Sequence, residues 1–210
     1  MDNTLRVTLV ANAGLLLEYH GTTLLLDGIY GKEGHPFSNL SPQVWQQMKE
    51  EKPPFDNVDY LLFTHAHPDH FSPEMTMEYL QHHPVKGVFA PDTRTVAESG
   101  LADFLKEQGT PCALLSEQTD RTGFRITPEI TVRAFRARHL DKQYEKVKHF
   151  CYLISFGEKT CCSPPTSTIF RKISAGCRAY IWMESLSIRC FSAYCTTGDF
   201  SRAHWKPGIL

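Results

Sequence analysis

The sequence lacks the features that would place it in a membrane or mark it for export. No stretch approaches the roughly 18 consecutive apolar residues that a membrane-spanning helix requires. Residues 1–4 do not open a basic segment followed by a long apolar stretch, the pattern that marks a secretory signal. We therefore expect a cytoplasmic protein that has no membrane partner.

An excess of charge of one sign is also absent. The 210 residues include 22 Lys or Arg and 23 Asp or Glu, which gives a formal net charge of −1. A balance of this kind provides no overall electrostatic attraction for a polyanion. Nucleic acid is therefore not an expected partner.

Cysteine pairs with the Cys-x-x-Cys spacing of a zinc knuckle are missing, although the chain has seven Cys. Five of the seven lie in the last 50 residues. Without a paired pattern, we interpret the cysteines as free thiols in a reducing compartment. This interpretation agrees with a cytoplasmic location.

A cluster of histidines is the most informative feature that the chain does contain. Residues 64–70 read Thr-His-Ala-His-Pro-Asp-His and directly follow a short apolar stretch that we expect to be a strand. Imidazole nitrogens and carboxylate oxygens are the ligands that a cation such as zinc prefers. His65 and His67 are two positions apart, so on an extended chain they point the same way and can reach one ion. Asp69 and His70 follow a turn and can face a second ion.

This stretch resembles the His-x-His-x-Asp-His signature of the metallo-β-lactamase-fold hydrolases, over about residues 5–160. The resemblance implies a first metal bound by His65, His67 and His139, and a second metal bound by Asp69 and His70. Asp69 would also orient or deprotonate the attacking water. Two zinc ions are expected for an intact site, with manganese or iron as alternatives. A bound divalent ion lowers the pKa of water to roughly 7.

Three further residues are candidates by the same resemblance. Asp27 ends an apolar strand, where the family has an Asp that holds a ligand histidine in place; the alternative is a simple Asp-Gly turn. Asp199, in a Thr-Gly-Asp sequence, is a candidate for the bridging Asp, but it lies too far past His139 for the family's spacing. His204 is the histidine available as a C-terminal ligand.

The expected function is that of a metal-dependent hydrolase. A metal-bound hydroxide would attack an ester, lactone, thioester or phosphoester in a small-molecule substrate. The motif does not choose among these substrates, and the oligomeric state is not encoded in it. The alternatives are a catalytically defective product of a shifted reading frame and a metal-binding protein without activity.

The predicted elements favour an α/β class in a layered α+β arrangement, which the resemblance sharpens to an αβ/βα sandwich. Alternation and turn residues predict strands over 5–10, 15–19, 22–27, 58–63, 85–90, 111–115, 123–127, 130–138 and 150–156. Helices are expected over 42–51 with Ser41 as N-cap, from Ser72 to about residue 82, and over 93–108 with Asp92 as N-cap.

The character of the chain changes near residue 160. We divide it into a metallo-β-lactamase-like domain, 1–160, and an atypical tail, 161–210. The tail has six Lys or Arg against two Asp or Glu, and neither a capped helix nor a bounded strand pair is predicted after Pro165. Where the family places a second apolar strand after Gly157, this chain has Cys-Cys-Ser-Pro-Pro. We therefore expect the second half of the fold to be incomplete.

A shift of reading frame near residues 159–161 explains this change. If the third base of each codon is joined to the first two bases of the next, the codons from Thr160 to Thr166 permit Leu-Leu-Phe-Thr-Ala-Asp. That reading contains both an apolar strand and a following Asp. The alternative is a genuine divergent tail.

Sequencing the gene across the codons for residues 157–168 tests the proposed frame shift. We expect one base to be missing or extra relative to the template, because a single change restores both the strand and its Asp. A coding sequence that stays in the present frame in a closely related gene would instead show that the tail is genuine.

Overall fold

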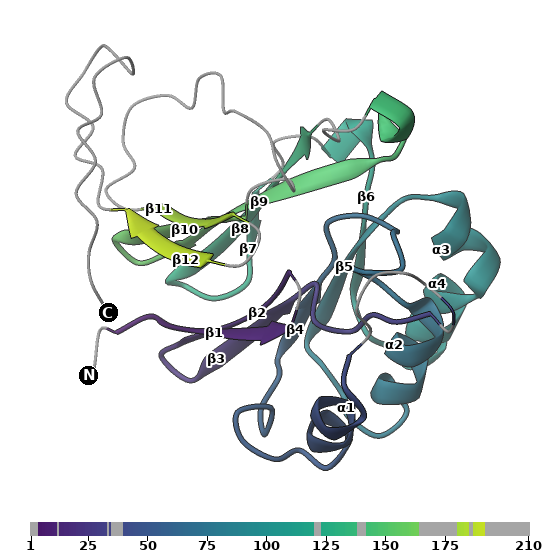
Figure 1. Ribbon diagram of the computed structural model, residues 1–210, viewed down its shortest axis with the longest axis horizontal. Helices are drawn as coiled ribbons and strands as arrows, with labels where there is room; N and C mark the ends of the chain where they lie inside the picture. Colours follow the sequence, from purple (N-terminus) through teal and green to yellow (C-terminus); the bar gives the residue numbers. More distant parts are fainter. Residues whose placement is uncertain are drawn as a thin grey trace. The chain divides into compact units, whose positions relative to one another are not determined.

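The computed structural model of the chain describes residues 4–11, 13–32, 34, 40–119, 123–137, 142–163, 180–184 and 187–191 (Figure 1). The chain divides into two compact units, Met1–Gln118 and Thr119–Leu210. The division into 1–160 and 161–210 stays a prediction. The first unit contains the histidine motif and a mixed sheet, and the second contains antiparallel sheets. Together the described elements confirm the predicted α+β class.

The first unit is built on a six-stranded sheet in which chain order and spatial order coincide. Strands β1 to β3 are antiparallel, and β3 to β6 are parallel. The strands are β1 (Arg6–Ala11), β2 (Gly14–Tyr19), β3 (Thr22–Leu26), β4 (Tyr60–Leu62), β5 (Gly87–Pro91) and β6 (Cys112–Leu115). The tight turn between β2 and β3 is made by His20 and Gly21, both at positive φ, as a two-residue hairpin requires.

Helices connect the parallel strands and cover one face of this sheet (Figure 1). They are α1 (Pro42–Lys49), α2 (Pro73–Leu80), α3 (Arg94–Ser99) and α4 (Leu101–Glu107). A short 3-10 helix at Glu117–Thr119 follows β6. Neighbouring strands contribute a row of buried side chains to the core beneath the helices: Leu16, Leu25, Leu61 and Val88. This row fixes the register of the strands, because a shift by one residue would turn each side chain to the other face.

The prediction of a single helix over 93–108 with Asp92 as its N-cap is wrong in two respects. Gly100 has φ of 78°, a left-handed conformation that ends α3 before α4 begins. The N-cap is Thr93, whose hydroxyl accepts a hydrogen bond from the Val96 N–H at 3.3 Å, and not Asp92. Ser41 caps α1 as predicted. Ser72, where the second helix was expected to begin, is the N-cap of α2.

The second unit has a four-stranded antiparallel sheet in the order β10-β9-β8-β7. Buried residues alternate along β8 and face those of β9, as in the pairs Val132 with Ile154 and Ala134 with Tyr152. The elements are β7 (Gly123–Arg125), β8 (Ile130–Ala137), a 3-10 helix (Lys142–Tyr144), β9 (His149–Phe156), β10 (Lys159–Ser163), β11 (Tyr180–Glu184) and β12 (Ser187–Phe191).

Two expectations about the end of the chain are corrected by these strands. A strand does follow Gly157: β10 pairs with β9 along its whole length, and Cys161, opposite Ile154, is buried. A strand pair also occurs after Pro165, where β11 and β12 form an antiparallel ladder. Cross-strand pairing therefore accommodates residues whose own pattern does not predict a strand. The frame shift stays a prediction.

Three of the cysteines, Cys112, Cys151 and Cys161, are free thiols. Burial raises the pKa of the Cys112 thiol to about 11. Within the residues that the structure describes, every helix is too short or too polar to cross a membrane.

Replacement of Thr93 by Ala tests the observed cap of α3. We expect Thr93→Ala to lower the free energy of unfolding by about 1 kcal/mol, because the Val96 N–H loses its acceptor. Thr93→Ser keeps the hydroxyl and should retain most of the stability. Urea unfolding followed by circular dichroism measures both variants, and equal stability of Thr93→Ala and the wild type would contradict the cap.

Candidate metal centre

The candidate site lies in the first unit, where two parallel strands end side by side. Leu26 and Leu62 are paired at the carboxyl ends of β3 and β4, so the loops after them leave the sheet together. The Asp27 N–H donates to the carbonyl of Leu62 at 2.9 Å. Crevices at the carboxyl ends of strands are the usual ligand sites of open α/β sheets. Asp27 and the histidine motif are therefore close in space, although Asp27 and Thr64 are 37 positions apart in the sequence.

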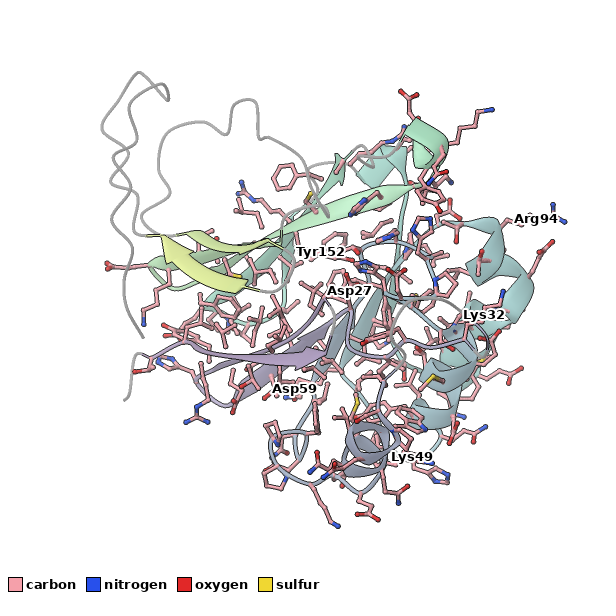
Figure 2. The ribbon with its side chains drawn as sticks, viewed as in Figure 1. Asp27, Lys32, Lys49, Asp59, Arg94 and Tyr152 are labelled. Atoms are coloured by element: carbon pink, nitrogen blue, oxygen red, sulfur yellow. The ribbon has the colours of Figure 1, made fainter. Side chains whose placement is uncertain are left out.

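The carboxylate of Asp27, a residue labelled in Figure 2, is the centre of the hydrogen bonding at this site. Its Oδ1 accepts from the Thr64 N–H at 2.8 Å, and its Oδ2 accepts from the Thr64 hydroxyl at 2.6 Å. Nδ1 of His70 lies 2.9 Å from the same Oδ2. Asp27 is only 2% exposed, so these contacts replace the water that a buried carboxylate loses. The backbone of Asp27 has φ of 45°, a left-handed conformation that turns the chain after β3. The same residue therefore turns the chain with its backbone and orients His70 with its side chain.

One ring nitrogen of His65 and one of His67 point toward each other. Nε2 of His65 lies 3.1 Å from Nδ1 of His67, as expected for side chains two positions apart on an extended segment. His65 is fully buried and His67 is partly buried. Two nitrogens at this separation can share a proton or bind one cation between them.

Asp69 and His70 lie beside this pair. Nε2 of His70 is 3.8 Å from Oδ2 of Asp69, and the rings of His65 and His70 have centroids 4.1 Å apart. The pKa of His70 is raised above its ordinary value. Burial by itself would lower this pKa, but the hydrogen bond to Asp27 and the negative charges of Asp27 and Asp69 have the larger combined effect. The Asp27 contact occupies Nδ1, so Nε2 is the His70 atom available to a cation.

Local sequence holds the motif in this shape. His67 ends the extended segment, and its carbonyl accepts from the N–H groups of His70 and Phe71 at 2.9 Å, which closes a turn. Phe71 then packs on Phe63, with ring centroids 4.3 Å apart. Ser72 begins α2 and donates its N–H to the carbonyl of Ile29, which ties the loop to the segment after β3.

The donor set suits a divalent cation, but the described residues supply only part of a site. Within residues that the structure describes, no three His, Cys, Asp or Glu side chains are grouped so that they could hold an ion. The pair of converging imidazoles is chemically appropriate for zinc, iron or manganese, and needs a third ligand. The proposed third ligand, His139, lies outside the described residues, as do Asp199 and His204.

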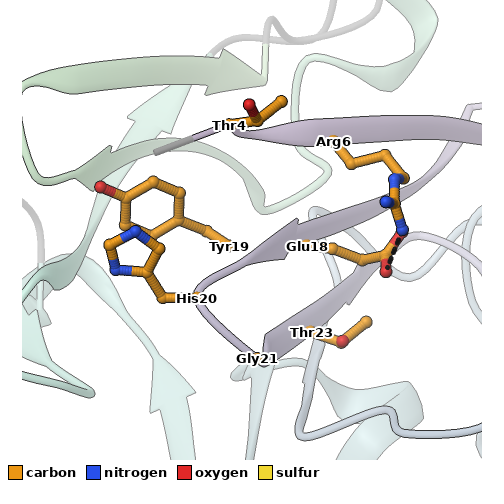
Figure 3. A pocket seen from close by; sticks show the side chains of 7 residues that line it. All are labelled: Thr4, Arg6, Glu18, Tyr19, His20, Gly21 and Thr23. Atoms are coloured by element: carbon orange, nitrogen blue, oxygen red, sulfur yellow. Dashed lines mark hydrogen bonds and ion pairs between the residues drawn. The ribbon is translucent and has the colours of Figure 1, made fainter. Parts of the chain in front are cut away.

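A separate hollow lies at the other end of β3 (Figure 3). Its volume is about 460 Å³, and its walls include Arg6, Glu18 and Thr23 and the stacked rings of Tyr19 and His20. Arg6 is paired with Glu18 at 3.1 Å. The hollow lies beside the β2–β3 turn, whereas Asp27 follows the opposite end of β3, so the hollow is distinct from the candidate metal centre.

Thr64 is a further residue of this site, and the sequence motif predicted no role for it. It is buried, and its hydroxyl contacts both Asp27 and Nδ1 of His65, the latter at 2.9 Å. The signal available in the sequence was its position, directly after an apolar strand and directly before the first histidine.

Comparison with known families identifies the chain. A family model described as a beta-lactamase superfamily domain matches residues 22–163, which include Asp27, the histidine motif and β10. The chain belongs to this superfamily. The predicted resemblance to the metallo-β-lactamase fold is thereby confirmed. A search of curated proteins finds no match.

Solved structures show the same superfamily fold. Igni18, a metallo hydrolase from Ignicoccus hospitalis KIN4/I, is 15% identical with a TM-score of 0.51, over 79% of this chain and 62% of its own. CmlA, a diiron beta-hydroxylase from Streptomyces venezuelae, is 21% identical with a TM-score of 0.50, over 80% of this chain and 30% of its own. The chain therefore spans less than two thirds of either structure, and the likeness concerns the fold alone.

Replacement of Asp27 by Asn tests the hydrogen bonding of the metal-free site. The Asn side chain has nearly the same volume as Asp, but its amide offers one acceptor oxygen where the carboxylate has two. At least one buried donor of Thr64 or His70 therefore loses its partner. We expect the free energy of unfolding to fall by about 1–3 kcal/mol. Urea unfolding measures the change.

The matched control is Asp56→Asn, because Asp56 is exposed. That exchange should leave the stability nearly unchanged. An equal loss in both variants would show that the Asp27 contacts do not stabilise the unit.

Proposed function

We propose that this superfamily member is a metal-dependent hydrolase that acts on a small-molecule ester, lactone, thioester or phosphoester. The observation that carries the proposal is the convergence of His65 Nε2 and His67 Nδ1 at 3.1 Å, beside Asp69 and His70. Superfamily membership supports the reaction class. The choice of substrate within that class is open, because one fold supports many chemistries.

The ligand assignment follows the motif. His65 and His67, with His139, would hold one ion, and Asp69 with His70 would hold a second. Asp27 would bind neither ion and would keep His70 oriented through its Nδ1 contact. We propose zinc, with manganese or iron as alternatives, since each accepts imidazole and carboxylate ligands.

The chemistry that a bound divalent ion supplies is a lower pKa for water and polarisation of the bond to be cleaved. The chain's own residues do the remaining work. Asp69 has a partly exposed side chain, so one carboxylate oxygen can orient an attacking water or accept its proton. His65 and His70 are buried and fixed by Thr64 and Asp27, so the geometry is set before substrate arrives.

A metal-binding or catalytically defective protein is the second candidate. It is favoured by the distance in sequence between Asp199 and His139, which is longer than the spacing that the family has between its ligands. Metal stoichiometry separates the candidates: about two ions per chain favour the enzyme, and one or none favours the defective product. The cytoplasmic location stays a prediction.

The proposed function is tested with the full chain after removal of metal by a chelator and after addition of zinc. We expect zinc to be retained through gel filtration, and zinc-loaded protein to hydrolyse at least one of a p-nitrophenyl ester, bis(p-nitrophenyl) phosphate, an acyl homoserine lactone and an acyl thioester. The chelated protein should be inactive, and added zinc should restore the rate.

Asp69→Asn, compared with Asp56→Asn, locates the activity in the motif. We expect Asp69→Asn to lower the rate by roughly 10²–10⁴-fold, as loss of a group that transfers protons does, and Asp56→Asn to leave it unchanged. A chain that retains no zinc, or a rate that is insensitive to chelation and to Asp69→Asn, would contradict the proposal.

A further inference from the structure

We infer that Thr64 is a positioning residue that fixes the proton of neutral His65 on Nδ1, so that Nε2 presents a lone pair to the place between His65 and His67. The contact between Asp27 and His70 does not by itself fix the proton of His65, which needs the Thr64 hydroxyl between Asp27 and His65. Thr64 touches neither candidate ion nor substrate in the proposed scheme. It acts through the histidine that follows it in the chain.

The direction of the hydrogen bonds around Thr64 follows from counting protons. A carboxylate can only accept, so the Thr64 hydroxyl donates its one hydrogen to Asp27 Oδ2 at 2.6 Å. The hydroxyl oxygen then has only lone pairs for Nδ1 of His65, which lies 2.9 Å away. Nδ1 must therefore carry the hydrogen and donate it to Thr64.

The consequence lies on the opposite side of the imidazole ring. A neutral imidazole with its hydrogen on Nδ1 has an unprotonated Nε2. That atom is the one 3.1 Å from Nδ1 of His67. A cation placed between the two rings thus meets a lone pair on His65 without any transfer of that proton, as metal ligation by neutral imidazole requires.

Because the contact between Thr64 and His65 is buried, the Thr64 hydroxyl is the acceptor that His65 Nδ1 depends on. Both Thr64 and His65 are nearly inaccessible to solvent, so water cannot readily replace the hydroxyl as the acceptor. The same Oδ2 of Asp27 also contacts Nδ1 of His70. One carboxylate oxygen therefore orients histidines assigned to both proposed metals, directly for His70 and through the Thr64 hydroxyl for His65.

Nitrogen-15 NMR of the histidine rings in the full, metal-free chain tests the inference, at a pH where the imidazoles are neutral. In wild-type protein we expect the His65 Nε2 signal to be that of an unprotonated nitrogen and the Nδ1 signal to be that of a protonated one. Thr64→Ser retains the hydroxyl and should give the same pattern. Thr64→Val has a similar shape but no hydroxyl, and should shift the hydrogen toward Nε2, which can donate to His67.

A wild-type His65 with its hydrogen on Nε2 would overturn the inference, and this result needs no variant to fold. Retention of the wild-type pattern in folded Thr64→Val would overturn it as well. A purely structural role of Thr64 would change stability but not the position of the proton, so circular dichroism and urea unfolding of all three proteins complete the comparison.

Zinc affinity, measured by competition with a chromophoric chelator, adds a second readout that rests on the proposed function. We expect Thr64→Val to weaken zinc binding by roughly 10–100-fold, the usual effect of removing a partner of a ligand histidine, and Thr64→Ser to retain wild-type binding. Equal affinity in Thr64→Val and wild type would contradict the role toward metal. If wild-type protein binds no zinc, the proposed function fails, whereas the NMR result still decides the position of the proton.

Discussion

The buried carboxylate of Asp27 is the group on which the rest of the site depends. It lies where β3 ends beside β4. It accepts hydrogen bonds from the Thr64 N–H and hydroxyl, and it contacts Nδ1 of His70. A carboxylate without partners in such a place would be strongly destabilising. The contacts that satisfy it are therefore also those that bring the loop after β3 and the histidine motif together and orient two of its rings.

The sheet explains why this contact can form between residues far apart in sequence. Parallel pairing of β3 with β4 aligns Leu26 with Leu62, and the buried row through Leu25 and Leu61 holds that register beneath the helices. A shift of either strand would move Asp27 away from Thr64 and would also expose apolar side chains. Stability of the core and geometry of the site thus depend on the same pairing.

Most of the strands, two of the helix N-termini and the residues of the histidine motif could be predicted from the sequence, because each of these depends on a local pattern. The extended segment itself predicted that His65 and His67 point the same way. Thr64 was missed because its partner, Asp27, is 37 residues away and only strand pairing brings the two together. The break at Gly100 was missed because an isolated glycine within a helical pattern is often tolerated. Strand β10 was missed because its own residues favour no strand, and pairing with β9 decides its conformation.

A crystal structure of the zinc-loaded chain, with zinc located by anomalous scattering, tests directly whether His65 and His67 bind one ion while Asp27 only orients its neighbours. We expect an ion about 2.0–2.1 Å from both Nε2 of His65 and Nδ1 of His67. Asp27 should still accept from Thr64 and contact His70 without touching the ion. An ion bound by the Asp27 carboxylate, or bound away from both His65 and His67, would contradict the ligand assignment.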